Sequence, residues 1–238
     1  MKLNPQQLCI TVVMVSLSLI AGCARAAVSP ARNVPIGGSI KLPAPRLNGS
    51  MSVEKALDTR RSVRSYADAP LSIAEVGQLL WAAQGITDPK TGHRTAPSAM
   101  AVYPMTVYLV AGKVTGLAPG VYRYEPKDHS IVKIMDGDKR SEMVANGGQP
   151  TFGKAPVDLV IAGDYGKMAA KMHGSQASSR FVDIEAGHVA ENVCLQATAL
   201  DLGTVTAAGF NQDKLKETLA LPSAETPIYV MPVGKLPK

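Results

Sequence analysis

The stretch from Asp183 to Leu202 reads DIEAGHVAENVCLQATALDL and is the longest helical pattern in the chain. Its apolar residues recur at helical spacing and leave little of the circumference polar: Ile184, Ala186, Val189, Ala190, Val193, Cys194, Ala197 and Leu200. A helix that is apolar around most of its circumference is buried on most sides. We therefore expect a central helix, covered by a sheet on one side and by a second subunit on the other.

The sheet is predicted from five β-branched or aromatic runs, each bounded by Gly, Pro or Asp: residues 106–110, 121–124, 131–134, 157–162 and 228–233. Three shorter helices accompany them. Ser52 can cap a helix over 52–58, Ser72 and Glu75 form a capping box for a helix that Gly85 ends, and residues 211–220 form an amphipathic helix. The pattern predicts an α+β fold, with one central mixed sheet and helices around it.

Composition places the chain among folded globular proteins and gives little support for nucleic-acid binding. The 238 residues are 46% hydrophobic and 18% charged, whereas a disordered chain is poor in the first class and rich in the second. The formal net charge is +6, and about +4 without Lys2 and Arg25. The basic residues form no run and alternate with acids, so we expect no nucleic-acid partner.

Residues 1–26 have the organisation of an export signal, with Lys2 near the start and an apolar run from Leu8 to Ala21. This segment is too short to span a bilayer permanently. Ile20-Ala21-Gly22-Cys23 resembles a bacterial lipobox, in which Cys23 is lipidated, while Ala24-Arg25-Ala26 offers a rival A-x-A cleavage site. We expect an exported protein, either periplasmic or a membrane-anchored lipoprotein, whose lipid anchor would be its contact with the membrane.

A Pro-rich segment follows, and the folded domain is expected at residues 51–238. Residues 27–50 carry four prolines and the pair Gly37-Gly38, show neither helical nor strand periodicity, and predict an extended tether. Cys194 is the one cysteine of the body, so an internal disulfide is excluded there. A small apolar residue inside a buried helix accounts for it better than a reactive thiol does.

The densest cationic cluster is Arg60-Arg61-Ser62-Val63-Arg64-Ser65-Tyr66, between the first two predicted helices. Three guanidinium groups within five residues repel one another unless an anion lies among them, and phosphate oxygens suit the fork of an arginine. The cluster alone is also compatible with a solvated basic turn.

Ordered motifs along the rest of the chain resemble the nitroreductase flavoprotein family, and most closely its branch of SagB-type dehydrogenases. The resemblance runs from about Val53 to Lys235. It rests on the arginine cluster and on a series of short segments: Leu79-Leu80-Trp81-Ala82-Ala83-Gln84-Gly85, Arg94-Thr95-Ala96-Pro97-Ser98-Ala99, Tyr103-Pro104, Gly120-Val121-Tyr122-Arg123-Tyr124, Glu185-Ala186-Gly187-His188 and Pro232-Val233-Gly234.

This resemblance implies a homodimer with two FMN molecules at the subunit interface and a ping-pong redox cycle on a small organic substrate. The cofactor-binding residues that it implies are Arg60, Arg61, Ser62, Arg64, Pro97, Ser98, Ala99, Met100, Ala207, Ala208, Gly209 and Lys235. The first four would hold the phosphate and the polar edge of the ring, residues 97–100 would pass beside the isoalloxazine, and residues 207–209 would meet it near N5. Lys235 is a last phosphate contact or a solvated lysine. The family commonly has a small residue where this chain has Met100.

The sequence thus predicts an exported FMN-dependent oxidoreductase in which the flavin carries the chemistry and no side-chain acid or base is named. The alternative is a flavin-free lipoprotein that uses the same fold as a binding or interaction module. Among the histidines, His93 is expected in a solvated loop and His188 as a satisfied interior residue. The four histidines show no metal-ligand spacing, so we expect no metal site.

Overall fold

The computed structural model describes residues 32–174 and 177–237. The predicted export signal, Cys23 and residues 27–31 of the predicted tether lie outside the described residues. Among the helices that are described, none is both long and apolar enough to cross a membrane.

A seven-stranded sheet forms the centre of the molecule, with the strand order β1-β8-β7-β5-β9-β11-β10. The ladders between its strands are antiparallel, and parallel pairing occurs at the β10 edge, where Ser62 bridges Thr204. Its strands are β1 (Ser39–Lys41), β5 (Met105–Ala111), β7 (Gly120–Glu125), β8 (Ser130–Asp136), β9 (Val157–Asp164), β10 (Leu202–Thr204) and β11 (Glu225–Lys235). Two small pairs accompany it: β2 (Leu71–Ser72) with β6 (Val114–Thr115), and β3 (Ile86–Asp88) with β4 (His93–Arg94).

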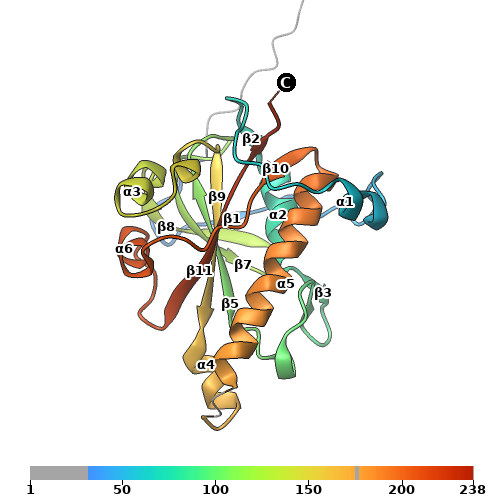
Figure 1. Cartoon of the computed structure of the whole chain (residues 1–238), viewed down its shortest axis with the longest axis vertical. Helices are drawn as coiled ribbons and strands as arrows, with labels where there is room; N and C mark the ends of the chain where they lie inside the picture. The colour runs from blue at the N-terminus through green and yellow to red at the C-terminus, as the bar shows by residue number, and fades with distance from the viewer. Residues whose placement is uncertain (1–31, 175–176, 238) are drawn as a thin grey trace, which may run out of the picture.

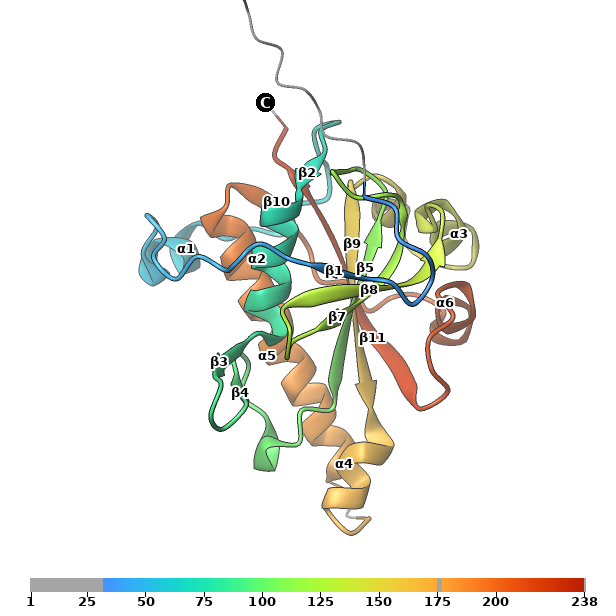
Figure 2. The ribbon, with the colours of Figure 1, turned by 180° about the vertical axis from the view of Figure 1, so that it is seen from behind.

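Helices cover both faces of the sheet, as Figures 1 and 2 show. On one face lie α2 (Ile73–Gln84) and α5 (Ser178–Ala199), with α1 (Val53–Thr59) and α4 (Tyr165–Lys171) against α5. On the other lie α3 (Arg140–Ala145), α6 (Gln212–Thr218) and the 3₁₀ turn η2 (Pro150–Gly153); a second 3₁₀ turn, η1, spans Ala99–Ala101. Each face has its own apolar cluster, so the molecule is a three-layer α+β domain, as predicted.

The long helix α5 confirms the central element of the prediction, although it begins five residues before Asp183 and ends at Ala199. Val189, Val193 and Ala197 are fully buried against the sheet and α2. The opposite side of α5 is open in this protomer, because Ile184 keeps 44% of its surface exposed and His188 is exposed. The expectation of an interior His188 is therefore wrong, since the residue lies on the side of the helix away from the sheet.

The predicted helix caps are present. Ser52 accepts a hydrogen bond from the Lys55 amide at 3.1 Å, and the Ser72–Glu75 capping box starts α2. Gly85 ends α2, as predicted, and α6 has a further cap in Asn211, which accepts from the Lys214 amide at 3.0 Å. These side chains satisfy amide groups that the first turn of a helix leaves without partners.

The described part of the predicted tether is not a free linker. Residues Ser39–Lys41 form β1 and pair with β8 at the edge of the sheet. Ile40 and Leu42 are buried, and the Gln78 side chain exchanges two hydrogen bonds with the backbone of Arg46. The prediction is wrong here because three residues are too few to show strand periodicity, and their burial depends on a sheet edge formed more than 80 residues later.

Candidate cofactor site

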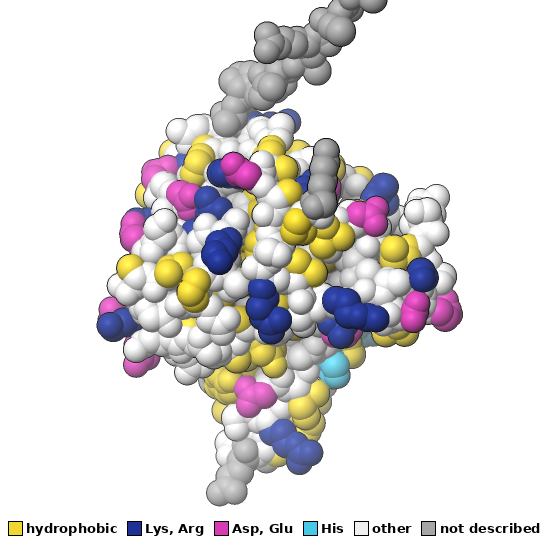
Figure 3. Space-filling view, turned by 45° about the horizontal axis from the view of Figure 1, so that its top comes forward, with side chains coloured by type: hydrophobic (Ala, Val, Ile, Leu, Met, Phe, Trp, Pro, Cys, Tyr) yellow, Lys and Arg dark blue, Asp and Glu magenta, His cyan; other side chains and the backbone are white. Residues whose placement is uncertain are grey.

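The arginine loop, residues Arg60–Arg64, joins the end of α1 to the β10 edge of the sheet. Ser62 bridges Thr204, and the Val63 amide donates to the Thr204 carbonyl at 2.9 Å. Gly203 makes this approach possible, since a Cβ there would lie 2.6 Å from Val63 Cγ1. The loop is thus held by its backbone, and the side chains of Arg61, Ser62 and Arg64 are exposed. Figure 3 shows one face of the molecule, on which Lys and Arg side chains surround apolar patches.

The three guanidinium groups of this loop have few partners within the protein. Arg60 Nε lies 3.7 Å from Glu191 Oε1 on α5, a long and exposed ion pair. Arg61 Nη1 donates to the carbonyls of Asp58 and Arg60. Within the described residues, neither Arg61 nor Arg64 forms an ion pair with a carboxylate, so both charges remain available to an anion.

Lys235 reaches the same end of the molecule, but its ammonium is already engaged. Lys235 pairs with Leu202 of β10 in the sheet register, and its carbonyl accepts a hydrogen bond from the Ala67 amide. Its Nζ forms an ion pair with Glu75, whose pKa is lowered by Lys235 and by hydrogen bonds from Ser72 against the opposing effect of burial. Lys235 is therefore ion-paired within the protein, and its role as a last phosphate contact stays a prediction.

Residues Ala207–Gly209 follow β10 and continue along the same surface. Ala207 exchanges backbone hydrogen bonds with Val230 of β11, which leaves Ala208 and Gly209 exposed. The Thr206 hydroxyl lies 3.6 Å from Cys194 Sγ on α5, and Cys194 is buried, as predicted for a small apolar residue of the helix. The arginine loop and residues 207–209 thus form one continuous region.

Residues Pro97–Met100 lie elsewhere, beside the first half of α5. Ser98 Oγ donates to Glu185 Oε2 at 2.5 Å and accepts from the Tyr103 amide at 2.8 Å. Met100 and Ala101 both have φ of 53°, in the left-handed region that favours glycine, and Met100 keeps 53% of its surface exposed. The turn holds Met100 outward where the family commonly has a small residue.

In one protomer the predicted site residues therefore fall into two places. Glu185, which holds Ser98, and Glu191, which Arg60 of the arginine loop reaches, are six residues apart, or about 9 Å along the helix axis. No hydrogen bond or strand pairing within the described residues joins Pro97–Met100 to the arginine loop or to residues 207–209.

The residues of the arginine loop fit the phosphate of FMN by their chemistry. Two guanidinium groups without carboxylate partners and the exposed Ser62 hydroxyl are donors of the kind that a phosphate dianion requires. The buried Thr204 hydroxyl, beside Ser62 and without a hydrogen-bond partner, supplies another polar group. No group of three or more metal-ligating side chains occurs among the residues described.

A buried polar cluster next to Ser98 was not predicted from the sequence. Glu185 is 2% exposed, burial raises its pKa, and Arg94 and Gln84 lie near it. Arg94 donates to the Gln84 side chain at 2.7 Å and lies over the Tyr103 ring, 4.6 Å from its centroid. The spacing of the helix could have predicted the burial of Glu185. The residue stands three positions after Val182 and four before Val189, on the buried face of α5.

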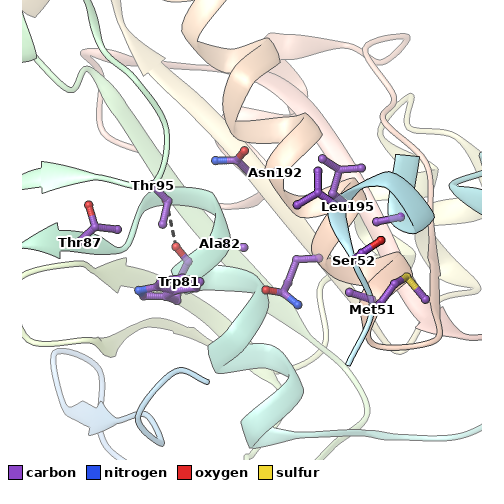
Figure 4. A pocket seen from close by; sticks show the side chains of 12 residues that line it. Met51, Ser52, Trp81, Ala82, Thr87, Thr95, Asn192 and Leu195 are labelled. Atoms are coloured by element: carbon purple, nitrogen blue, oxygen red, sulfur yellow. Dashed lines mark hydrogen bonds between the residues drawn. The ribbon is translucent and has the colours of Figure 1, made fainter. Parts of the chain in front are cut away.

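An apolar hollow of about 410 Å³ lies between α1, α2 and α5. In Figure 4, Met51 and Ser52 border it from the start of α1, Trp81 from α2, and Leu195 from α5. Thr95 borders the far side and donates its hydroxyl to the Trp81 carbonyl at 3.1 Å. The hollow adjoins the exposed apolar residues Val53 and Leu57 of α1.

Comparison with known proteins decides the family. The model of the Nitroreductase family matches residues 57–235, three quarters of the chain. A nitroreductase-family protein of Methanocaldococcus jannaschii is 38% identical over 201 residues, which cover 84% of this chain and 98% of the relative. The chain belongs to the nitroreductase family. It is therefore an oxidoreductase by family, and the resemblance noted from its motifs is confirmed.

Solved structures of nitroreductase-family proteins agree with this assignment. One from Ralstonia eutropha JMP134 has a TM-score of 0.74 and 30% identity, over 88% of this chain and 98% of that chain. The E. coli microcin synthetase McbBCD complex with truncated pro-MccB17 has a TM-score of 0.65 at 20% identity, over 96% of this chain and 85% of that chain, a likeness of fold. A second relative by sequence is the trifolitoxin operon protein TfxC of Rhizobium leguminosarum. It is 25% identical over 193 residues, which cover 75% of this chain and 54% of TfxC.

Proposed function

We propose that the protein is an FMN-dependent oxidoreductase that acts on a small organic substrate, with the SagB-type dehydrogenases as its branch. The observation that carries this proposal is the arginine loop, in which Arg61 and Arg64 have no carboxylate partner within the described residues. FMN, when bound, supplies the ring that accepts and returns a hydride. The chain itself would hold the phosphate with Arg60, Arg61, Ser62 and Arg64.

The working form is a homodimer. In support of this, large apolar side chains remain exposed on two helices: Val53 and Leu57 of α1 are 65% and 56% exposed, and Ile184 of α5 is 44% exposed. A second copy would cover this side of α5. It would also supply Pro97–Met100 to the flavin, since no hydrogen bond or strand pairing within the described residues joins this segment to the arginine loop of its own protomer.

Export remains part of the proposal through the first 26 residues, with Cys23 as the lipidation site or Ala26 as the last residue removed. Mass spectrometry of the mature N-terminus distinguishes the two forms. A diacylated Cys23 supports the lipoprotein, and an unmodified N-terminus at Ala27 supports a soluble periplasmic protein.

Replacing Arg61 and Arg64 together by Ala tests the cofactor site. Each charge-assisted hydrogen bond contributes about 1.5–3 kcal/mol, so calorimetry should show FMN affinity lower by a few kcal/mol. Arg180→Ala, an exposed arginine of α5, is the matched control and should bind FMN as the wild type does. A wild-type protein without flavin absorbance and without measurable FMN binding would instead favour the flavin-free binding module.

A further inference from the structure

The central sheet forks at one end, between β5 and β7. These two strands pair from Tyr108↔Arg123 to Ala111↔Gly120 and no further. Beyond that point, Met105–Val107 pair with β9 alone, while Tyr124 and Glu125 pair with β8 alone. Figure 2 shows β7 and β8 running away from β5 and β9. The fork leaves an opening in the sheet that side chains from other elements must fill.

A polar pocket of about 300 Å³ occupies this fork. The ends of β5, β7, β9 and β11 border it, together with the end of α2, β4, the start of α4 and the segment between η1 and β5. Three cations and three acids line it: Arg94, Arg123, Lys167, Glu125, Asp164 and Glu225. Their formal charges sum to zero. Whether the pocket favours an anionic or a cationic ligand therefore depends on which of these groups already have partners within the protein.

The three acids are paired within the protein. Glu125 accepts a hydrogen bond from Arg123 Nε at 2.6 Å. Glu225 accepts from the hydroxyls of Thr106 and Tyr108 at 2.9 and 2.6 Å. Asp164 caps α4 by accepting from the Lys167 amide at 2.8 Å.

In the described part of the chain, the buried atoms without a hydrogen-bond partner near the pocket are two donors on its wall and one acceptor, Glu185 Oε1, whose carboxyl group interacts electrostatically with Arg94 and Lys167. Gln84 is 1% exposed, and its Nε2 has no hydrogen-bond partner; neither does Arg94 Nε. Lys167 Nζ donates to the Tyr103 carbonyl at 2.9 Å. Among the described residues, no carboxylate forms an ion pair with Arg94 or Lys167. A buried donor without an acceptor costs about 1–3 kcal/mol, which a bound acceptor would recover.

We propose that the fork pocket, defined by Gln84, Arg94 and Lys167, binds the carboxylate group of a small organic molecule. The planar guanidinium of Arg94 and the Gln84 amide offer donors to carboxylate oxygens, and Lys167 adds a second positive charge. A carboxylate fits better than a phosphate dianion, because the three acids on the pocket wall repel the higher charge more strongly.

The fork pocket is connected to the turn that we expect beside the flavin. The Tyr103 ring stacks on Arg94, and the Tyr103 amide donates to Ser98, which holds Glu185. Tyr103 has a φ of 49°, so its backbone is fixed in a strained conformation between the pocket and the turn. The pocket itself uses no residue of the arginine loop, and its occupation does not depend on FMN.

Calorimetric titration of the purified protein with succinate, acetate and benzoate tests the proposal, with sodium chloride at equal ionic strength as the blank. We expect saturable binding of at least one carboxylate. Arg94→Gln and Lys167→Met should each weaken that binding at least tenfold. Lys171→Met, on the same helix but outside the pocket, is the matched control and should bind as the wild type does.

Lys167 is exposed, so Lys167→Met keeps the test valid even if Arg94→Gln fails to fold. Absence of saturable binding of all three carboxylates to the wild type would overturn the proposal. Equal affinities of wild type and Lys167→Met would also overturn it. A flavin-free preparation that binds the carboxylate would support the fork pocket even where the cofactor proposal fails.

Discussion

The arginine loop and the fork pocket are two cationic places built in opposite ways. The loop takes Arg60, Arg61 and Arg64 from five consecutive residues, with Arg61 and Arg64 exposed and Arg60 half-buried. The pocket collects Gln84, Arg94 and Lys167 from separate elements and places them behind a buried acid, Glu185. Solvated charges carry little desolvation cost, so the arginine loop affects ligand binding more than stability. In the pocket Lys167 is exposed, but Gln84 Nε2 and Arg94 Nε are buried donors that need partners, so the pocket matters for both stability and binding.

The largest effect is expected when the arginine loop is separated from the sheet. In Gly203→Ala the new Cβ would lie 2.6 Å from Val63 Cγ1, and Leu236 leaves no space on the other side. We expect a loss of about 3 kcal/mol in the free energy of unfolding, measured by chemical denaturation, together with weaker FMN binding. Gly187→Ala, where a Cβ meets nothing within 4 Å, is the control and should cost nothing. Equal stability of the two variants would show that the loop does not depend on this contact.

The second prediction compares a serine from each region. Ser98→Ala leaves a buried Glu185 oxygen and the Tyr103 amide without their partner, which should cost about 2 kcal/mol. Ser62→Ala removes an exposed hydroxyl and should change stability by less than about 0.5 kcal/mol while weakening FMN binding. Urea denaturation of both variants measures the contrast. A larger loss in the free energy of unfolding for Ser62→Ala than for Ser98→Ala would contradict the distinction between a buried and an exposed serine.

The third prediction uses the raised pKa of Glu185, which results chiefly from burial and is opposed by Ser98 and Arg94. A raised pKa in the folded state means that wild-type stability falls as pH rises through the ordinary carboxyl pKa toward the folded value. Glu185→Gln keeps an acceptor for Ser98 and does not ionise. The variant should therefore gain stability relative to the wild type as pH increases from acidic to neutral. A difference that stays constant with pH would show that Glu185 titrates normally.

The smallest effect is expected at Lys235. Its half-exposed ion pair with Glu75 should contribute at most about 1 kcal/mol to stability. Because its charge is shared with Glu75, Lys235→Met should weaken FMN binding less than Arg61→Ala does. Calorimetry on both single variants checks the order, and a larger loss at Lys235 would make it a principal phosphate ligand.

Features that depend on residues close together in the chain could be predicted from the sequence. The helix of residues 183–202, the Ser72–Glu75 capping box and the five main strands follow from local periodicity and capping. The strand at residues 39–41 was missed because its pairing with β8 is a long-range contact. Glu185, Arg94 and Gln84 were not assigned to a site, because their meeting depends on how α2, α5 and the turn before η1 come together.

The binding of the FMN phosphate by the arginine loop can be tested with a ligand that lacks the phosphate. Comparing the affinities of FMN and riboflavin, which lacks the phosphate, for the wild type and for the Arg61→Ala/Arg64→Ala variant tests it most directly. With about 1.5–3 kcal/mol for each charge-assisted hydrogen bond, the wild type should prefer FMN at least about 100-fold. The double variant should lose most of that preference and keep its riboflavin affinity. Equal affinities of the wild type for FMN and riboflavin would contradict the claim.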